Sequence, residues 1–279
     1  PTRRSSDLNN GIKKASGKYL IFMDPDDWYP EEDILEVLFE KAEKSGCHIC
    51  GGEFSEYDDR TGEVRTEFPE QYFGYVFPNE GVIEYEDWQF DFGYHRFLYN
   101  REFILEHQLY FPKLIRFQDP PFFVRAMITA ERFYAVKKVV YRYRYGHREL
   151  KWTKEKRIDL LKGIYMDMEM AVQNHLERLV DLTWFRMTEE FGKIIFEGII
   201  EKEKNTREWI EKIYSILDKN RRERNGYPFY DRLIDEYRKK VETINVLEAG
   251  ADAVKKTITF RVGEILLYIP RSIKLVFFR

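Results

Sequence analysis

The sequence of 279 residues predicts an α/β fold that is followed by a C-terminal helical region. Two apolar, strand-like segments, Tyr19–Met23 and Cys47–Tyr57, flank Glu31–Ser45, whose apolar residues recur at helical spacing. A third strand-like segment, Val139–Tyr145, alternates aromatic and basic residues. Beyond Glu149 the chain changes to amphipathic helical patterns rich in Lys and Glu. Strands that alternate with helices are typical of an α/β domain.

The first of these elements can be bounded from local signals. The helix over Glu31–Ser45 is expected to end at Gly46. Its predicted buried face comprises Ile34, Leu35, Leu38, Phe39 and Ala42. The strand Cys47–Tyr57 is followed by a turn at 58–62 and by Glu63–Phe68, which together predict a hairpin. Further along, Leu160–Val172, Phe191–Ile199 and Trp209–Leu217 each carry apolar residues at helical spacing.

An acidic turn comes directly after the first strand. Asp24, Asp26 and Asp27 lie within four residues, at the carboxyl end of Tyr19–Met23, which is where open α/β sheets place their ligands. Clustered carboxylates repel one another, and a hard divalent cation with oxygen ligands would relieve that repulsion. An acidic turn that starts the next helix at Pro30 explains the same residues. Spacing alone leaves both interpretations open.

The residues before this turn extend the pattern into a family resemblance. The lead-in Asn10–Tyr19, followed by the strand and D-P-D-D, resembles the core of the family 2 glycosyltransferases. The resemblance implies a GT-A (Rossmann-like) fold that binds a nucleotide-sugar donor. By that resemblance Asp24 and Asp26 form the D-x-D pair, contacting the nucleotide and holding Mg²⁺ or Mn²⁺ on the donor diphosphate. Asp27 is then a further acid behind them.

The resemblance continues more loosely downstream. Gly93–Ile104 is similar to a family stretch, and Phe111-Pro112 with Arg116–Asp119 is similar to its "F-P … E-D" stretch, with Gln118 in place of the usual Glu. By this resemblance Asp119 is the catalytic base, because an inverting transfer needs one carboxylate to accept the acceptor hydroxyl's proton. Asp119 before Pro120 also fits the N-cap of a helix, and the two roles are compatible.

His147 and Arg148 follow the third strand. Comparable enzymes often carry a His or a basic residue there, near the diphosphate, so His147 is a candidate metal ligand or phosphate donor, with Arg144 or Arg148 as a charge partner. The alternative is a solvent-exposed loop histidine.

The two ends of the chain carry separate predictions. Residues 1–8 resemble a translated sequencing adapter and are expected to be a non-native scar. We then expect a partial GT-A catalytic domain at 9–149 that lacks its first strands, a helical appendage at 150–247, and an apolar and basic segment at 248–279. Lost strand neighbours would leave an exposed sheet edge, so the chain alone is expected to be poorly soluble or inactive.

Composition restricts the partners. A net charge of −3 and a pI near 6.1 argue against general nucleic-acid binding. Cys47 and Cys50 are expected to be ordinary buried cysteines, which suits a cytoplasmic protein, because a zinc site needs two more ligands. In Ile258–Arg279 the longest uncharged run is much shorter than the ~20 residues of a spanning helix. This segment either lies in a membrane interface or packs as a final helix.

The combined prediction is a metal-dependent glycosyltransferase that moves a sugar, with inversion, from a nucleotide-diphosphate donor to a glycan or lipid-linked acceptor. The expected location is the cytoplasm or the inner face of the membrane, with peripheral association. Two alternatives use the same residues. One is a non-catalytic carbohydrate-binding or scaffolding protein of this fold, and the other is a metal-dependent phosphoryl-transfer enzyme.

Overall fold

The computed structural model describes residues 5–147, 151–201 and 203–223, together with short pieces at 239, 242–243, 246–247, 249–251 and 253. The chain divides into two compact units, residues 1–220 and 221–279, and the first unit contains everything described below. Arg148 and the segment Ile258–Arg279 lie outside the described residues. Residues 5–8 of the predicted scar form the start of helix α1 (Ser5–Lys14), and the origin of that segment stays a prediction.

The described residues form one six-stranded sheet with the order β1-β5-β2-β6-β4, and β3 pairs with β2 outside this path. The strands are β1 (Tyr19–Ile21), β2 (Ile49–Asp58), β3 (Val64–Arg65), β4 (Gly81–Glu84), β5 (Phe97–Asn100) and β6 (Arg132–Tyr145). The β2–β6 pair is parallel and the other pairs are antiparallel. Because β5 runs antiparallel to both β1 and β2, the carboxyl ends of β1, β2 and β6 all meet at one edge of the sheet.

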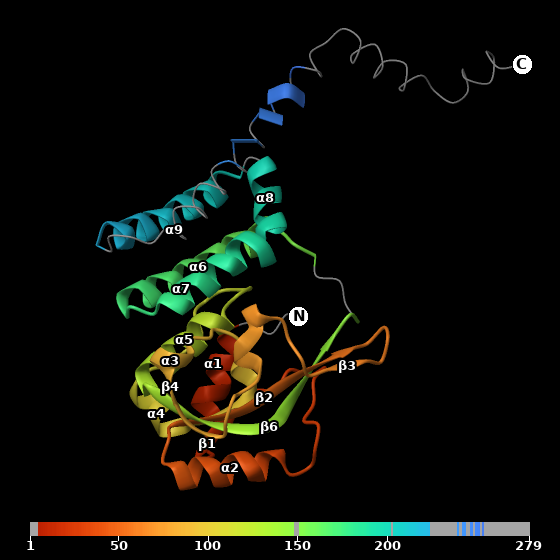
Figure 1. Ribbon diagram of the computed structural model, residues 1–279, viewed down its shortest axis with the longest axis vertical. Coiled ribbons are helices and arrows are strands. Elements are labelled where there is room, and N and C mark those ends of the chain that lie inside the picture. The colour runs from red at the N-terminus through yellow and green to blue at the C-terminus, as the bar shows by residue number, and fades with distance from the viewer. Residues whose placement is uncertain are drawn as a thin grey trace, which may run out of the picture. The chain divides into compact units, whose positions relative to one another are not determined.

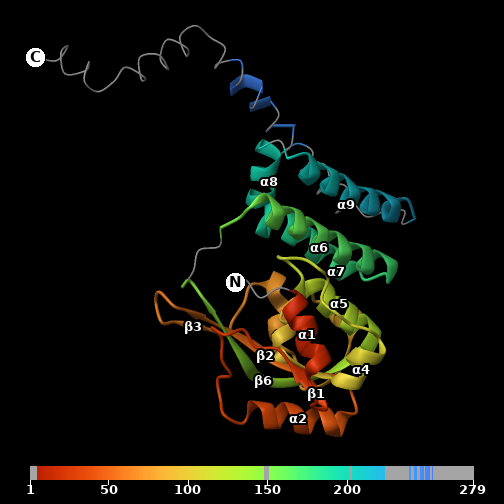
Figure 2. The ribbon, with the colours of Figure 1, turned by 180° about the vertical axis from the view of Figure 1, so that it is seen from behind.

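Helices cover both faces of the sheet. Helix α2 (Ile34–Ser45) lies on one face, and α1, α3 (Tyr85–Trp88), α4 (Arg101–Glu106) and α5 (Asp119–Ala130) lie on the other, as Figures 1 and 2 both show. The core between them is largely aromatic. The Phe22 ring, for example, has its centroid 5.3 Å from that of Phe111 and 5.6 Å from that of Phe122. This dense aromatic packing holds in place the end of the sheet where β1, β2 and β6 terminate.

The predicted helix over Glu31–Ser45 is confirmed from Ile34 onward, and its buried face is narrower than expected. Ile34, Leu38 and Ala42 are at most 1% exposed, whereas Leu35 and Phe39 are each 46% exposed. The helix has one row of residues against the sheet, and the neighbouring row faces outward. Gly46 ends the helix with φ +67°, and its N–H donates to the Ala42 carbonyl (3.1 Å), as a glycine C-cap does.

The predicted hairpin is also confirmed. Strands β2 and β3 pair antiparallel, and the turn between them is closed by the Gly62 N–H donating to the Asp58 carbonyl (2.8 Å). Cys47 and Cys50 are both buried and not disulfide-bonded. Burial raises the pKa of Cys50 to about 12, so this thiol is a packing residue.

The helical region predicted beyond Glu149 lies against the core. It comprises α6 (Lys154–Gln173), α7 (Glu177–Phe185), the π-helix η3 (Arg186–Glu190), α8 (Gly192–Ile200) and α9 (Lys204–Glu223). Helix α6 packs on both α5 and α7 (Figure 1). The three predicted helical patterns fall in α6, α8 and α9, whereas α7 and η3 were not predicted. Within the described ranges, every helix is too short or too polar to cross a membrane.

Candidate active site

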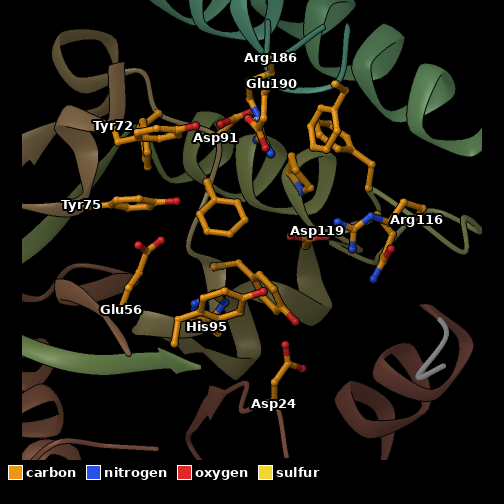
Figure 3. Close-up of a pocket in the computed structure, with 18 of the residues that line it drawn as sticks. Asp24, Glu56, Tyr72, Tyr75, Asp91, His95, Arg116, Asp119, Arg186 and Glu190 are labelled. Carbon is orange, nitrogen blue, oxygen red and sulfur yellow. Dashed lines mark hydrogen bonds and ion pairs between the residues drawn. The ribbon is translucent and has the colours of Figure 1, made fainter. Parts of the chain in front are cut away.

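A pocket of about 650 Å³ opens at the sheet edge where β1, β2 and β6 end. Figure 3 shows Asp24 at one end of it, Asp119 and Arg116 on one side, Tyr72 and Tyr75 on the opposite side, and Arg186 with Glu190 at the far end. Parts of the chain far apart in sequence therefore line one space, among them the acidic turn, the start of α5, the 3-10 helix η1 (Glu70–Tyr75) and the π-helix η3. The helical region thus supplies one wall of the pocket, through Leu182, Arg186, Glu190 and Phe191.

The acidic turn is held on β6 by hydrogen bonds at both of its ends. The Asp27 N–H donates to the Asp24 carbonyl (3.2 Å), which closes the turn. The Tyr141 hydroxyl accepts from the Asp24 N–H (3.2 Å) and donates to the Asp27 carboxylate (2.7 Å). The other oxygen of Asp27 accepts from the Arg144 N–H (2.8 Å). Tyr141 therefore joins the first and last residues of the turn.

These contacts give the three acids different surroundings. Asp24 and Asp26 line the pocket, whereas Asp27 is directed at β6. Burial raises the pKa of Asp27, while its hydrogen bonds from Arg144 and Tyr141 act in the opposite direction. Asp27 thus anchors the turn behind the two pocket acids.

His147, at the end of β6, is brought to the acidic turn. Its Nε2 lies 2.9 Å from the Asp26 carboxylate, and its side chain is 17% exposed. The alternative of a solvent-exposed loop histidine is therefore wrong for this structure. His147 does not itself line the pocket, so it contacts Asp26 from behind.

The pocket acids suit a divalent cation that is shared with a ligand. Among the described residues, no three His, Cys, Asp or Glu side chains are grouped as a complete protein metal site. Asp24 and Asp26 offer carboxylate oxygens, which are the ligands that Mg²⁺ and Mn²⁺ prefer. Mg²⁺ is commonly bound by one or two carboxylates, with phosphate oxygens and water completing its coordination. The residues therefore fit a cation held jointly with a diphosphate.

Asp119 faces the same pocket from the start of α5, as Figure 3 shows. The N-cap interpretation is wrong in detail, because Gln118 occupies the cap position and Asp119 is the first helical residue. Pro120 and Pro121 follow it, and the missing N–H of Pro121 removes a donor that a capping Asp119 would use. The Asp119 carboxylate is thus left facing the cavity. Burial raises its pKa, and the nearby positive charge of Arg116 opposes that rise.

An aromatic wall stands opposite Asp119. It consists of Phe68, Tyr72, Tyr75, Phe90 and Phe92. The rings of Tyr72 and Tyr75 are parallel within 4°, with centroids 5.6 Å apart. This wall is held by Arg96, which is fully buried. Its guanidinium donates to the carbonyls of Gly52 (2.8 Å), Tyr75 (3.2 Å) and Gly74.

The far wall is an ion-pair network that the sequence did not reveal. Arg186 donates from Nη1 to the Asp91 carboxylate (2.7 Å) and from Nε to Glu190 (3.0 Å). Arg186 and Asp91 are 6% and 1% exposed at their side chains. The four-residue spacing of Arg186 and Glu190 was a signal for an intrahelical pair, but nothing local pointed to Asp91.

A further carboxyl group, Asp167 of α6, lies behind this network. It is fully buried, and neither of its oxygens has a hydrogen-bond partner among the residues that the structure describes. Burial, reinforced by the charge of Asp91, raises the pKa of Asp167 well above its usual value. Burial raises the pKa of Asp91 as well, although Arg186 opposes this. The carboxyl pair therefore retains protons more tightly than free aspartic acids do.

Comparisons with known proteins agree on one family. The profile of glycosyl transferase family 2 matches residues 2–107. A protein described as "Uncharacterized glycosyltransferase EpsJ", from Bacillus subtilis (strain 168), is 34% identical over 147 residues, which are 50% of this chain and 41% of that protein. "Putative glycosyltransferase EpsH" from the same organism is 28% identical over 141 residues, or 49% of this chain and 40% of that protein.

Solved structures agree on the fold. The crystal structure of S. aureus TarS 1-349 superposes with a TM-score of 0.55 at 13% identity, covering 76% of this chain and 60% of that one. The same protein in complex with UDP-GlcNAc gives a TM-score of 0.53 at 14% identity, with the same coverage. The core is therefore the α/β, GT-A-type fold predicted from the sequence, followed by a helical region. The chain spans about two fifths of the length of the two B. subtilis relatives.

Proposed function

Because residues 2–107 match the profile of glycosyl transferase family 2, we propose that the protein transfers a sugar from a nucleotide-diphosphate donor to a glycan or lipid-linked acceptor, with inversion. The observation that supports this most strongly is that Asp24, Asp26 and Asp119 line a single pocket, although Asp119 lies 93 positions after Asp26. A structural relative crystallised with UDP-GlcNAc supports a nucleotide-sugar as the donor.

The proposed chemistry assigns one role to each side of the pocket. Asp119 accepts the proton of the acceptor hydroxyl while that oxygen bonds to the anomeric carbon of the donor sugar. The bond from this carbon to the diphosphate breaks on the opposite face, which inverts the configuration. The raised pKa of Asp119 strengthens it as a base relative to a free aspartate.

Asp24 and Asp26 would hold Mg²⁺ or Mn²⁺ together with the donor diphosphate. A bound cation would offset the negative charge that develops on the leaving diphosphate. The hydrogen bonds of Tyr141 and Asp27 hold the turn and thereby orient the two acids toward the pocket.

Asp119→Asn tests the proposal in the complete gene product that carries this chain. We expect sugar transfer to fall by about 10²–10⁴-fold, the usual contribution of a general base, with donor binding by calorimetry retained. Asp87→Asn, on the exposed side of α3, is the matched control and should leave both unchanged.

Two other outcomes would contradict the proposal. Unchanged ligand binding with no transfer in either protein would favour the non-catalytic carbohydrate-binding alternative. Metal-dependent release of phosphate from a phosphate monoester, abolished by Asp26→Asn, would favour phosphoryl transfer.

A further inference from the structure

The half of the pocket that lies away from Asp24 has no role in the donor chemistry described above. Its aromatic side is formed by Tyr72 and Tyr75, whose hydroxyl groups point toward the interior in Figure 3. Its far end is formed by Asp91 and Glu190, and His95 lines the pocket between this half and Asp24, as Figure 3 shows. Aromatic rings that carry hydroxyls, mixed with carboxylates, present apolar surface and hydrogen-bonding groups side by side.

The charges in this half disfavour an anionic ligand. Arg65 is already paired with Glu56, with its Nε 3.0 Å from that carboxylate. Arg186 lies between the carboxylates of Asp91 and Glu190. Both of these guanidiniums therefore already face a carboxylate, and Arg116, the further arginine of the pocket lining, lies beside Asp119 in Figure 3. A phosphate or carboxylate held at the far end would meet the carboxylates of Asp91 and Glu190, whose cation is already engaged.

Two side chains that line the pocket, His95 and Asp91, carry buried polar atoms without a hydrogen-bond partner among the described residues. His95 is 3% exposed, and neither ring nitrogen has a hydrogen-bond partner among the described residues. Burial and the neighbouring Arg96 charge lower the pKa of His95 to about 3, so its neutral ring offers one donor and one acceptor. One oxygen of Asp91 is also buried and unpartnered within the described part of the chain. Buried polar groups of this kind call for a partner.

The backbone at the far end is itself irregular. Residues Arg186–Glu190 form a π-helix directly after α7, and such single turns are frequent at functional sites. The wider turn presents both Arg186 and Glu190 to the pocket. An irregular helix that aims an ion pair into a cavity is a second sign, independent of the unpartnered atoms, that this end receives a ligand.

From these contacts we propose that the space bounded by Tyr72, Tyr75, Asp91, His95 and Glu190 binds an uncharged sugar ring of the acceptor. The ligand's hydroxyls bond to Glu190 and to the tyrosine hydroxyls, and its apolar C–H groups pack against the aromatic side. This assignment rests on the proposed transferase function, because the acceptor hydroxyl must come next to Asp119. The neutral acceptor ring would then lie at the far end of the pocket, and the anionic donor would lie at Asp24 and Asp26.

The test measures sugar binding without any donor. Maltose, chitobiose and a glucuronate-containing disaccharide are titrated against the protein and followed by saturation-transfer NMR. We expect at least one neutral disaccharide to bind, and the glucuronate disaccharide to bind at least about tenfold more weakly. Tyr72→Ala should weaken neutral binding by about tenfold, whereas Tyr110→Ala, a half-buried tyrosine that does not line the pocket, should leave it unchanged.

Further variants keep the test decisive if Tyr72→Ala fails to fold. Glu190→Gln should weaken neutral binding severalfold, whereas Glu189→Gln, the neighbouring residue, should not. Absence of binding by both neutral disaccharides, equal binding of the glucuronate disaccharide, or no effect of Tyr72→Ala and Glu190→Gln would each overturn the inference. Loss of transfer in Asp119→Asn is measured separately. Neutral sugar binding without any transfer would therefore retain this subsite and reject the proposed function.

Discussion

The two ends of the pocket are built in different ways. The acidic turn is one short segment, and hydrogen bonds to the Tyr141 hydroxyl and to the backbone of β6, 114 to 117 residues further along the chain, hold it in place. The opposite end is assembled from η1, the loop at Asp91 and the π-helix, and its buried ion pair joins Arg186 to Asp91, 95 residues away. The acids of one end therefore come from a single segment, whereas the other end depends on how the helical region docks.

The largest expected effect comes from breaking the assembled end. Arg186→Met leaves Asp91 buried without its cation, so the free energy of unfolding should fall by about 3–5 kcal/mol. Chemical denaturation measures this change, and Lys193→Met, an exposed cation in α8, is the control. Adding Asp91→Asn to Arg186→Met should restore part of the stability. A loss below about 1 kcal/mol would mean that the ion pair is not what holds this end.

A pH titration should sharpen the contrast. Burial raises the folded-state pKa of Asp167 above its unfolded value, so its contribution is stabilising at low pH and is lost as pH rises from the unfolded pKa toward the folded one. The stability of the wild-type protein relative to Asp167→Asn should therefore decline with pH, at up to about 1.4 kcal/mol per pH unit. Urea unfolding from pH 4.5 to 8 tests this, and parallel curves for the two proteins would contradict it.

Variants at the end formed by the acidic turn should change the stability less. Tyr141→Phe removes the hydroxyl that joins Asp24 and Asp27, and we expect a loss of about 1 kcal/mol in unfolding free energy. Binding of a nucleoside diphosphate with Mg²⁺, measured by calorimetry, should weaken because the turn is less firmly oriented. Tyr134→Phe, on the same strand but with a hydroxyl at an exposed Glu80, serves as the control. Equal behaviour of the two variants would remove Tyr141 from the description of the turn.

The smallest expected effect is a shift in a pH profile. The Arg116 charge lowers the pKa of Asp119, so Arg116→Gln should raise it. Because the base acts when deprotonated, the acid limb of kcat/KM should move to higher pH in this variant. A limb that stays in place while the rate changes would indicate that Arg116 acts on the substrate instead.

The sequence predicted the parts of the site that local chemistry determines. The apolar strand, the acids at its end, the helix stopped by Gly46 and the hairpin were all confirmed, because each follows from short-range periodicity and turn residues. Asp119 was correctly placed at a helix start, although the two prolines prevent it from acting as the cap. The roles of Asp24, Asp26 and Asp119 in catalysis stay predictions.

The rest required tertiary information. Two of the five residues of the predicted face of α2, Leu35 and Phe39, are exposed, because periodicity cannot tell how wide a stripe the sheet covers. The π-helix differs from an α-helix by a register change that packing imposes, so the local sequence does not mark Arg186 and Glu190 as pocket residues. Arg96 lies within Gly93–Ile104, and its buried contacts with three carbonyls depend on segments 21 to 44 residues away.

The position of Arg96 has a consequence for local opening of the structure. The 3-10 helix η1 contributes no strand to the sheet, and the Arg96 guanidinium ties its last carbonyls to β2. Lysine cannot reproduce a planar fork that serves several carbonyls. We therefore expect Arg96→Lys to speed amide hydrogen exchange at Tyr72 while amides in the β2–β6 pair stay protected. The aromatic wall would then be the first part of the pocket to open, ahead of the sheet that supports it.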